Sequence, residues 1–206
     1  DLYDTIKRQA KGEGSYGNYG NPFLVVCGDF EETWRILEFI HTLLKRSEKG
    51  KATHVVLLSR GEIPSDLRYA IKHTTIRDRV FFIRGNALES KCFARVRLDC
   101  AKAAFILAKG RVSDERLEDE ANTLRAWAFD HYAPNTNIYL ETRLPQTQYV
   151  LQDDSSMGVI CIAEFKQIFL AYNCLYKGFS TVLLNLLRGT KSRQFYEKPW
   201  QSQYAD

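Results

Sequence analysis

Short apolar strands alternate with amphipathic helices from Phe23 to Leu144, and this alternation restricts the possible folds more than any other feature. The strand-like runs are FLVVCG, THVVLLS, RVFFIRG, AAFILAK and NIYLETRL. Such continuously apolar strands are typical of a sheet that is buried on both faces. Helix-like segments such as WRILEFIHTLLKR and SDERLEDEANTLRAWAFDHY lie between them. The pattern predicts an α/β domain with a mostly parallel sheet and helices on both faces.

The first strand ends at Cys27-Gly28, where a Rossmann-like dinucleotide-binding domain has its glycine-rich turn. Such a site places three glycines across the turn, and here Gly28 is the only one. The neighbouring acidic residues Asp29, Glu31 and Glu32 would put negative charge where a pyrophosphate must lie. We therefore interpret Cys27 and Gly28 as a degenerate glycine turn and predict no bound cofactor.

One residue favours the opposite reading of this domain. Arg60 follows the second strand, where an arginine can accommodate the 2′-phosphate of NADP. An NADP- or nucleotide-binding Rossmann regulator or oxidoreductase therefore stays the alternative function.

Composition and motifs exclude several other classes. The chain has 29 basic and 25 acidic residues, a net charge of +4, so nucleic acid is not an expected partner. The four histidines lie on separate elements, and the sequence contains neither HExxH nor GxSxG, so we do not predict an enzyme. Five cysteines without CxxC spacing are interpreted as buried free thiols in a reducing compartment.

Two helices carry patterns that make specific predictions. In the first, we expect a single stripe of residues to face the core: Trp34, Leu37, Ile40, Leu43 and Leu44. The long later helix has Ser113 as its expected N-cap and acidic residues in its first two turns: Asp114, Glu115, Glu118, Asp119 and Glu120. Since carboxylates complement the positive end of the helix dipole, we favour a solvated acidic face over a cation site.

The chain divides into three predicted regions. Residues 1–21 end in a tract of Gly, Ser, Tyr and Asn without a core-facing period and are predicted to be a linker. Residues 22–150 form the Rossmann-like domain. Residues 151–206 form a helical segment, in which VICIAEFKQIFLAYNCLY and STVLLNLLRG are two helices, with Gly178 ending the first and Ser180 capping the second. The first residue is Asp, so we expect a piece of a longer protein, and no run of apolar residues is long enough to cross a membrane.

The helical segment presents more apolar surface than one edge of a sheet can cover. We predict that it forms an interface with another subunit. The alternative, that it folds back onto its own sheet, stays open. The interface candidates are Ile160, Ala163, Phe165, Ile168, Phe169, Tyr172, Leu183 and Leu186.

Several segments together resemble a known family: GEGSYGNYGNPFLVVCGDF, VFFIRGNAL, AAFILAKG, LRAWAFDHYAPNTNIYLETRLPQ and GVICIAEFKQIFLAYNCLYKGFSTVLLNLL. In this order they are similar to the first RCK domain (regulator of K⁺ conductance) of the Slo family of large-conductance potassium channels. The likeness covers nearly the whole chain. The linker and the hairpin are more like the calcium-activated branch, whereas LRAWA and APN are more like the sodium-activated branch.

The resemblance implies a regulatory role on the cytoplasmic side of a membrane channel. The domain would belong to the gating ring of a homotetrameric potassium channel, and would couple ion sensing to pore opening through the N-terminal linker. Its partners would be the second RCK domain and the pore domain of the same subunit, with potassium ions conducted by that pore. The helical segment would be the crossover hairpin between paired domains.

The resemblance also implies regulation by Ca²⁺, Mg²⁺ or Na⁺. In the calcium-activated branch, carboxylates on the helix after the first strand contribute to a calcium site. His41, Lys45 and Arg46 stand near the matching positions here, and a hard cation prefers oxygen ligands, so that site is not expected in this chain. Asp29, Glu31 and Glu32 are the alternative metal candidates, because ligands of such sheets bind at the rim formed by the carboxyl ends of the strands.

Overall fold

The computed structural model describes residues 12–17, 20–45, 53–151 and 157–188. The chain forms two compact units, Asp1–Ile162 and Ala163–Asp206, which we describe separately. None of the helices in the described ranges has the length and apolar content required of a membrane span.

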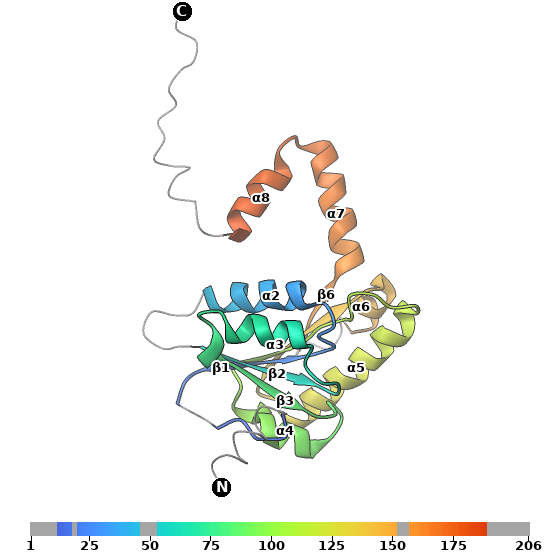
Figure 1. Cartoon of the computed structure of the whole chain (residues 1–206). Helices are drawn as coiled ribbons and strands as arrows, with labels where there is room; N and C mark the ends of the chain where they lie inside the picture. Colours follow the sequence, from blue (N-terminus) through green and yellow to red (C-terminus); the bar gives the residue numbers. More distant parts are fainter. Residues whose placement is uncertain (1–11, 18–19, 46–52, 152–156, 189–206) are drawn as a thin grey trace, which may run out of the picture. The chain divides into compact units, whose positions relative to one another are not determined.

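The first unit is built on one six-stranded sheet (Figure 1). Its strands are β1 (Phe23–Cys27), β2 (His54–Ser59), β3 (Val80–Arg84), β4 (Ala103–Ile106), β5 (Asn137–Thr142) and β6 (Met157–Cys161). They run in the order β3-β2-β1-β4-β5-β6, and every neighbouring pair is parallel. The order reverses between β1 and β4, where such sheets open a crevice for ligands. The predicted parallel sheet is confirmed.

Helices connect successive strands. They are α2 (Thr33–Lys45), α3 (Ser65–Lys72), α4 (Ser90–Val96), α5 (Glu115–Tyr132) and α6 (Pro145–Leu151), with short 3-10 turns at Arg77–Arg79 and Leu98–Cys100. Side chains of adjacent strand residues point to opposite faces of a sheet. Accordingly, Val26 and Leu57 belong to a core with α2 and α3, whereas Val25 and Val56 belong to a second core with α4 and α5. Helices on both faces are therefore confirmed.

The core stripe of α2 differs from the prediction at its first residue. Ile36, Ile40 and Leu44 are buried at steps of four residues, whereas Trp34 is 68% exposed. Two helical positions are separated by about 200°, so Trp34 points away from the face that carries Ile36. Leu37 and Leu43 are partly buried beside the same core.

The predicted linker is not wholly free of the domain. Residues 1–11 and 18–19 lie outside the described ranges, but Tyr16 is only 4% exposed and belongs to the core. The backbone N–H of Tyr16 donates to Arg95 O at 2.8 Å. The linker over residues 1–21 therefore stays a prediction, and within it Tyr16 packs into the core of the domain.

The sheet also continues beyond residue 150. The predicted helix begins at Val159, but Val159–Cys161 instead belong to strand β6, whose pairing with β5 aligns Tyr139 with Gly158. A Cβ on Gly158 would lie 2.7 Å from the ring of Tyr139, so glycine makes room for that ring. The predicted domain boundary after residue 150 stays a prediction. The compact unit that contains the sheet ends later in the chain, at Ile162.

The second unit contains a helical hairpin. Helix α7 (Ile162–Leu175) enters it, and α8 (Phe179–Arg188) follows a turn in which Gly178 has φ +85°. Phe179 lies against Tyr172 and Phe169, with ring centroids 5.1 and 6.1 Å apart. Since α8 begins at Phe179, Ser180 lies inside the helix and is not its cap; its N–H donates to Asn173 Oδ1 at 3.0 Å.

The cysteine prediction is correct only in part. All five thiols are free; Cys27, Cys92 and Cys161 are buried, but Cys100 and Cys174 are exposed.

Candidate functional site

The turn after β1 is filled by the protein's own backbone. Gly28 N–H donates to Leu58 O at 3.2 Å, and a Cβ on Gly28 would lie 3.1 Å from Leu107 O. Glycine thus allows β1 and the end of β4 to approach closely. Burial raises the pKa of the neighbouring Cys27 thiol to about 12, against an opposing effect of Arg125. Cys27 is consequently a protonated core thiol and no nucleophile at neutral pH.

The predicted acidic candidates lie in the loop between β1 and α2. Asp29 Oδ2 forms an ion pair with Lys109 Nζ at 3.0 Å, and this hydrogen bond raises the pKa of Lys109. The carboxylate of Glu32 lies directly over Gly110, where its Cδ would be 2.1 Å from an added Cβ. Glu31 is exposed and lines a polar cavity with Lys109.

These three carboxylates do not converge on one point. Within the described ranges, no group of three or more His, Cys, Asp or Glu side chains is arranged to hold a metal ion. His41 is a partly buried residue of α2, Lys45 ends that helix and Arg46 lies outside the described residues. A cation site at Asp29, Glu31 and Glu32 stays a prediction.

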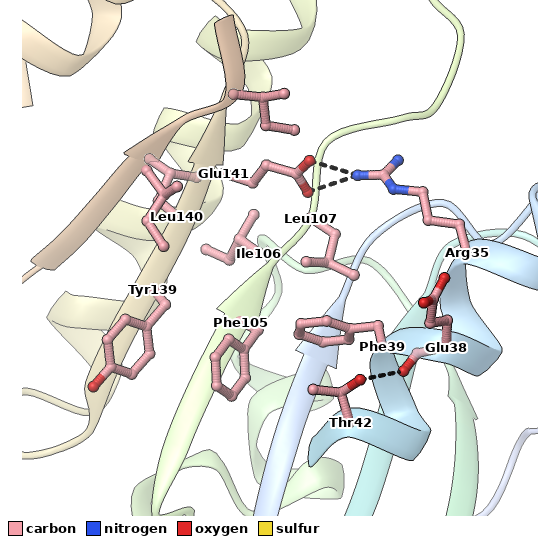
Figure 2. A pocket seen from close by; sticks show the side chains of 12 residues that line it. Arg35, Glu38, Phe39, Thr42, Phe105, Ile106, Leu107, Tyr139, Leu140 and Glu141 are labelled. Atoms are coloured by element: carbon pink, nitrogen blue, oxygen red, sulfur yellow. Dashed lines mark hydrogen bonds and ion pairs between the residues drawn. The ribbon is translucent and has the colours of Figure 1, made fainter. Parts of the chain in front are cut away.

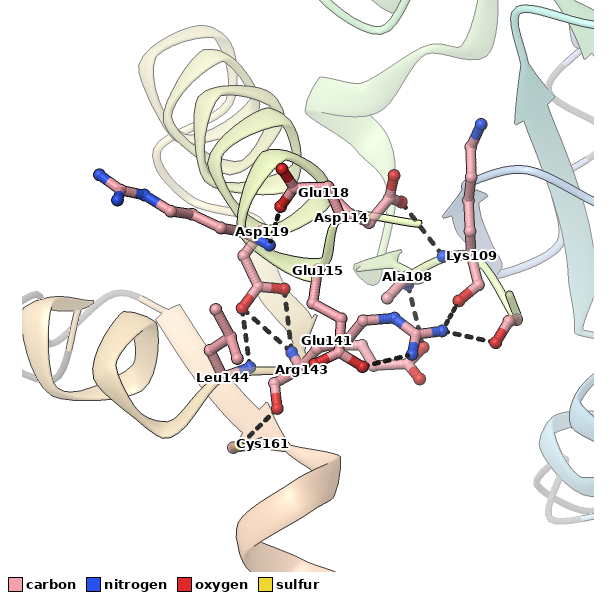
Figure 3. Close-up of polar contacts among 12 residues, drawn as sticks. Ala108, Lys109, Asp114, Glu115, Glu118, Asp119, Glu141, Arg143, Leu144 and Cys161 are labelled. Carbon is pink, nitrogen blue, oxygen red and sulfur yellow. Dashed lines mark hydrogen bonds and ion pairs between the residues drawn. The ribbon is translucent and has the colours of Figure 1, made fainter. Parts of the chain in front are cut away.

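A polar network at the same rim joins β4, β5 and α5, and Arg143 is at its centre (Figure 3). Arg143 Nη2 donates to Gly110 O at 2.7 Å and to Lys109 O, and Nη1 donates to Glu115 at 3.4 Å. A guanidinium offers several donors in a fixed plane, so one side chain can hold a whole loop. Arg143 therefore fixes the β4–α5 loop against the end of β5.

Asp119 and Glu118 hold the network from the side of α5. Asp119, 1% exposed, accepts hydrogen bonds from Arg143 N, Leu144 N and Thr147 Oγ1, while Glu118, 8% exposed, accepts from Lys109 N. The expected solvated face is thus wrong for two of its five acidic residues. Their carboxylates satisfy backbone donors of loops that pack onto the start of α5.

The start of α5 also differs from the prediction. Asp114 is the N-cap, and its Oδ1 accepts from Arg116 N at 3.0 Å and Leu117 N at 3.2 Å. Ser113 is therefore outside the cap position. Both residue types are favourable N-caps, and the predicted cap position is wrong by one residue.

Glu141, at the end of β5, joins the network to α2. Its carboxylate accepts two bonds from Arg35 Nη2, at 2.5 and 2.8 Å, and one from Ala108 N at 3.1 Å. Burial raises the pKa of Glu141, whereas Arg35 and the Ala108 N–H act in the opposite direction. The charged groups at this rim thus bind one another, in the region where a Rossmann-like fold would bind a ligand.

Beside this rim lies an apolar groove of 480 Å³ (Figure 2). Phe105 stacks on Tyr139 with ring centroids 5.1 Å apart, and Phe39 meets Phe105 edge-on at 5.5 Å. Ile160, one of the predicted interface residues, also lines the groove and is exposed. Phe105 of β4, Tyr139 of β5 and Ile160 of β6, which line this groove, are thus at least partly exposed to solvent.

The other predicted interface residues lie on the hairpin. Phe165, Ile168, Tyr172 and Leu186 are exposed, with Ile168 at 48% and Leu186 at 64%. Phe169 and Tyr172 also contact Phe179 inside the hairpin, and Ala163, Phe169 and Leu183 are partly buried. The hairpin retains exposed apolar side chains, but their role as an interface stays a prediction.

Sequence reasoning missed the network around Arg143. A usable signal was present, because Arg143 directly follows a parallel strand and Asp119 lies in the first turns of the preceding helix. The carboxyl ends of parallel strands and the amino ends of the following helices meet at one rim. The acidic cluster was instead interpreted through the helix dipole alone.

Comparison with known proteins identifies the family. Residues 19–140 match the model of the calcium-activated potassium channel slowpoke-like RCK domain. Residues 157–206 match the model of the calcium-activated BK potassium channel alpha subunit. The first match alone covers more than half of the chain.

Individual relatives agree with these models. Potassium channel subfamily T member 1 of Rattus norvegicus is 29% identical over an alignment of 209 residues, gaps included, which covers 99% of this chain and 16% of the relative. Potassium channel subfamily U member 1 of the same species is 28% identical over an alignment of 213 residues, gaps included, which covers 100% of this chain and 19% of the relative. The chain therefore spans less than one fifth of the length of these relatives.

Solved structures share the fold. The human SLO3 gating ring matches with a TM-score of 0.64 and 26% identity, over 81% of this chain and 28% of that chain. GsuK bound to ADP matches with a TM-score of 0.51 and 15% identity, over 78% and 37%, which is a likeness of fold alone.

These matches confirm the predicted resemblance, the fold class and the role of a regulatory domain on the cytoplasmic side of a potassium channel. The chain belongs to the slowpoke-like RCK domain family of calcium-activated potassium channels.

Proposed function

We propose that this chain couples the binding of a cytosolic ion to the opening of a potassium-conducting pore. It acts as one domain of a gating ring in a homotetrameric channel, with the pore domain and a second RCK domain of the same subunit as its partners. The pore conducts potassium ions, and the N-terminal segment transmits movement of the ring to it. No enzymatic step and no nucleic-acid contact are part of this function.

The observation that carries the proposal is the exposed apolar surface of the α7–α8 hairpin in a member of this family. Ile168 and Leu186 are exposed although apolar. Exposed apolar patches on a folded domain mark contacts with other proteins. A hairpin of this kind supports pairing with another RCK domain, whose relative movement would change the ring.

A closed ring of domains needs more than one contact surface on each domain, because a single self-complementary surface produces only a dimer. Helix α5 of the first unit offers a further surface. Leu117, Leu124 and Trp127 are exposed along it at steps of seven and three residues, which brings them to one side of the helix. This supports assembly beyond a pair of domains.

The activating ion is proposed to be Ca²⁺, Mg²⁺ or Na⁺. All three are hard cations, for which oxygen atoms are suitable ligands. The first ligands to test are Asp29, Glu31 and Glu32, with further oxygen ligands supplied by other parts of the channel. Because Asp29 forms an ion pair with Lys109, a cation bound by Asp29 would compete with the ammonium group of Lys109.

The test introduces a charge on the hairpin without disturbing its interior. Phe169 is unsuitable because it contacts Phe179 inside the hairpin. Ile168→Asp places a carboxylate on an exposed apolar position, and Gln167→Asp adds the same charge at the neighbouring exposed polar position. We expect Ile168→Asp to weaken self-association in sedimentation experiments at least about tenfold, because a charge buried at a contact is strongly unfavourable.

The same two variants are then compared in the whole channel. Ile168→Asp should change the ion dependence of opening, whereas Gln167→Asp should leave it close to wild type. Wild-type association together with wild-type gating in Ile168→Asp would contradict the proposed role of the hairpin.

A further inference from the structure

The segment Gly12–Tyr16, which we call the N-terminal strap, is attached to the domain at several points. The ring of Tyr16 lies against Phe23 of β1 and Phe81 of β3, with centroids 4.7 and 5.1 Å apart. Its hydroxyl is 2.8 Å from His54 Nδ1 at the start of β2. The strap thus touches three strands before the chain enters β1.

Arg95 of α4 holds the other part of the strap. Its Nη2 donates to Gly12 O at 2.7 Å and to Gly14 O at 2.8 Å, while Nε also donates to Gly14 O at 3.1 Å. Its Nη1 donates to Arg84 O at 2.8 Å, at the end of β3. One guanidinium therefore links the strap, α4 and β3, and charged donors make stronger bonds than neutral ones.

Backbone bonds complete the attachment. Arg84 N–H donates to Gly12 O, and Tyr16 N–H donates to Arg95 O, both at 2.8 Å. Strand β3 is an edge strand, since it stands first in the sheet order. The strap therefore supplies an acceptor to a strand edge that, in the part of the chain that the structure describes, has no further strand beside it.

The position of this attachment decides where a pull on the N-terminal segment would reach the domain. Ten residues, from Gly12 to Asn21, precede Pro22 and β1, and fully extended they would span about 33–36 Å. While the strap stays bound to Arg95 and β3, those residues add no length to the connection between the pore and the domain. If it is released, they lengthen the connection.

We propose that the N-terminal strap, clamped by Arg95, is the point at which force from the preceding chain enters this domain. This rests on the proposed function, in which the N-terminal segment transmits movement. The force then passes into α4 and the edge of β3, and the connection to the pore ends at Gly12 instead of at β1. Arg95 is a positioning residue that sets the working length of the connection.

The clamp itself is tested on this chain by hydrogen exchange. In Arg95→Ala, the amides of Tyr16 and Arg84 should exchange at least about tenfold faster, because local opening of the strap exposes them. Lys91→Ala is the matched control, an exposed basic residue on the same helix. The amide of Leu57 in β2 should stay protected in both variants, which verifies the fold. Wild-type exchange at Tyr16 and Arg84 in Arg95→Ala would overturn the clamp.

The force path is tested in the whole channel with two insertions of Gly-Gly. One lies between residues 11 and 12, before the strap, and the other follows Gly20, which is exposed. We expect the first insertion to shift the half-activating ion concentration and the second to shift it much less. In Arg95→Ala both insertions should act alike.

The outcomes separate the two hypotheses. Equal shifts from both insertions in the wild type would overturn the strap as the point of force entry, while coupling through the N-terminal segment would stand. No shift from the insertion before Gly12 would overturn that coupling, whatever hydrogen exchange reports about the clamp.

Discussion

Asp119 belongs to an acidic cluster that the sequence suggests is exposed, yet its carboxylate is buried and holds neighbouring loops in place. Its carboxylate accepts two backbone N–H bonds and one hydroxyl bond while only 1% of the residue is exposed. The donors belong to the turn after β5 and to α6, so one side chain of α5 fixes the connection between these two elements. Removing an acceptor of this kind leaves buried donors without a partner.

Asp119→Ala is therefore expected to destabilise the fold by about 3 kcal/mol. Urea unfolding followed by circular dichroism measures this change. Glu120→Ala on the same helix is the control, because Glu120 is exposed and bonds only to Arg116 among the contacts described, so its loss should stay within about 0.5 kcal/mol. Similar effects of the two substitutions would contradict a special role for Asp119.

His54 links stability to pH at the base of the strap. Asn21 Nδ2 lies 3.2 Å from Nε2, so Nε2 accepts and Nδ1–H donates to the hydroxyl of Tyr16. Both contacts suit the neutral ring. Burial, and then the positive charge of Arg79, lower the pKa of His54. Below pH about 6.5 the unfolded chain consequently binds more protons at this residue than the folded chain does.

The stability of the wild type should therefore decrease as the pH falls from about 6.5 towards the lower pKa of the folded state. His54→Gln should show a shallower decrease across the same range, whereas His131→Gln, at an exposed position on α5, should keep the wild-type slope. Urea midpoints measured at a series of pH values give these slopes. A wild-type slope in His54→Gln would rule His54 out as the titrating group.

At the scale of elements, substitutions at two glycines can separate the effect of close packing by the strap from the effect of backbone strain. Gly12 and Gly20 both have φ +74°, so an alanine is strained at either position. At Gly12 the new Cβ would also lie 2.8 Å from Arg84 N and from the ring of Phe82, whereas at Gly20 it would meet nothing within 4 Å. The difference between the two variants thus reports the close approach of the strap to β3.

Gly12→Ala should increase the exchange rate of the Arg84 amide about tenfold or more, and Gly20→Ala should leave it near the wild-type rate. Since both substitutions carry the same backbone strain, the comparison isolates the collision. Equal exchange in the two variants would mean that Gly12 does not pack closely against the strand edge.

The elements differ in how far the sequence alone could predict them. Strands β1 to β5 follow from their continuous apolar runs, and α2 and α5 from their length and periodicity. Strand β6 was missed because Val159–Cys161 runs without a break into the apolar helix α7, so no turn signal separates them. Tyr16 was missed because a single aromatic residue in a glycine-rich tract has no periodicity, and its pocket is formed by residues distant in sequence.

For the whole molecule, the crevice at the reversal of strand order is the clearest difference from a nucleotide-binding domain. Asp29 pairs with Lys109, the Glu32 carboxylate covers Gly110, and Glu141 binds Arg35. The first two features place protein carboxylates where phosphates would need hydrogen-bond donors. The lack of the further glycines could be seen from the sequence. The internal ion pairs at this site could not be predicted, because they join residues that are distant in sequence.

This arrangement predicts that the chain does not bind nucleotides. Isothermal titration with NAD, NADP, AMP and ADP should show no binding heat, with a dinucleotide-binding dehydrogenase under the same conditions as the positive control. Asp29→Asn together with Glu32→Gln should also give no heat, because removing the charges does not create the close glycine turn that a pyrophosphate requires. Saturable heat with the wild type would favour the nucleotide-regulated alternative. Its loss on Lys109→Ala, with Lys102→Ala as control at an exposed lysine that does not line this cavity, would locate that ligand at the rim.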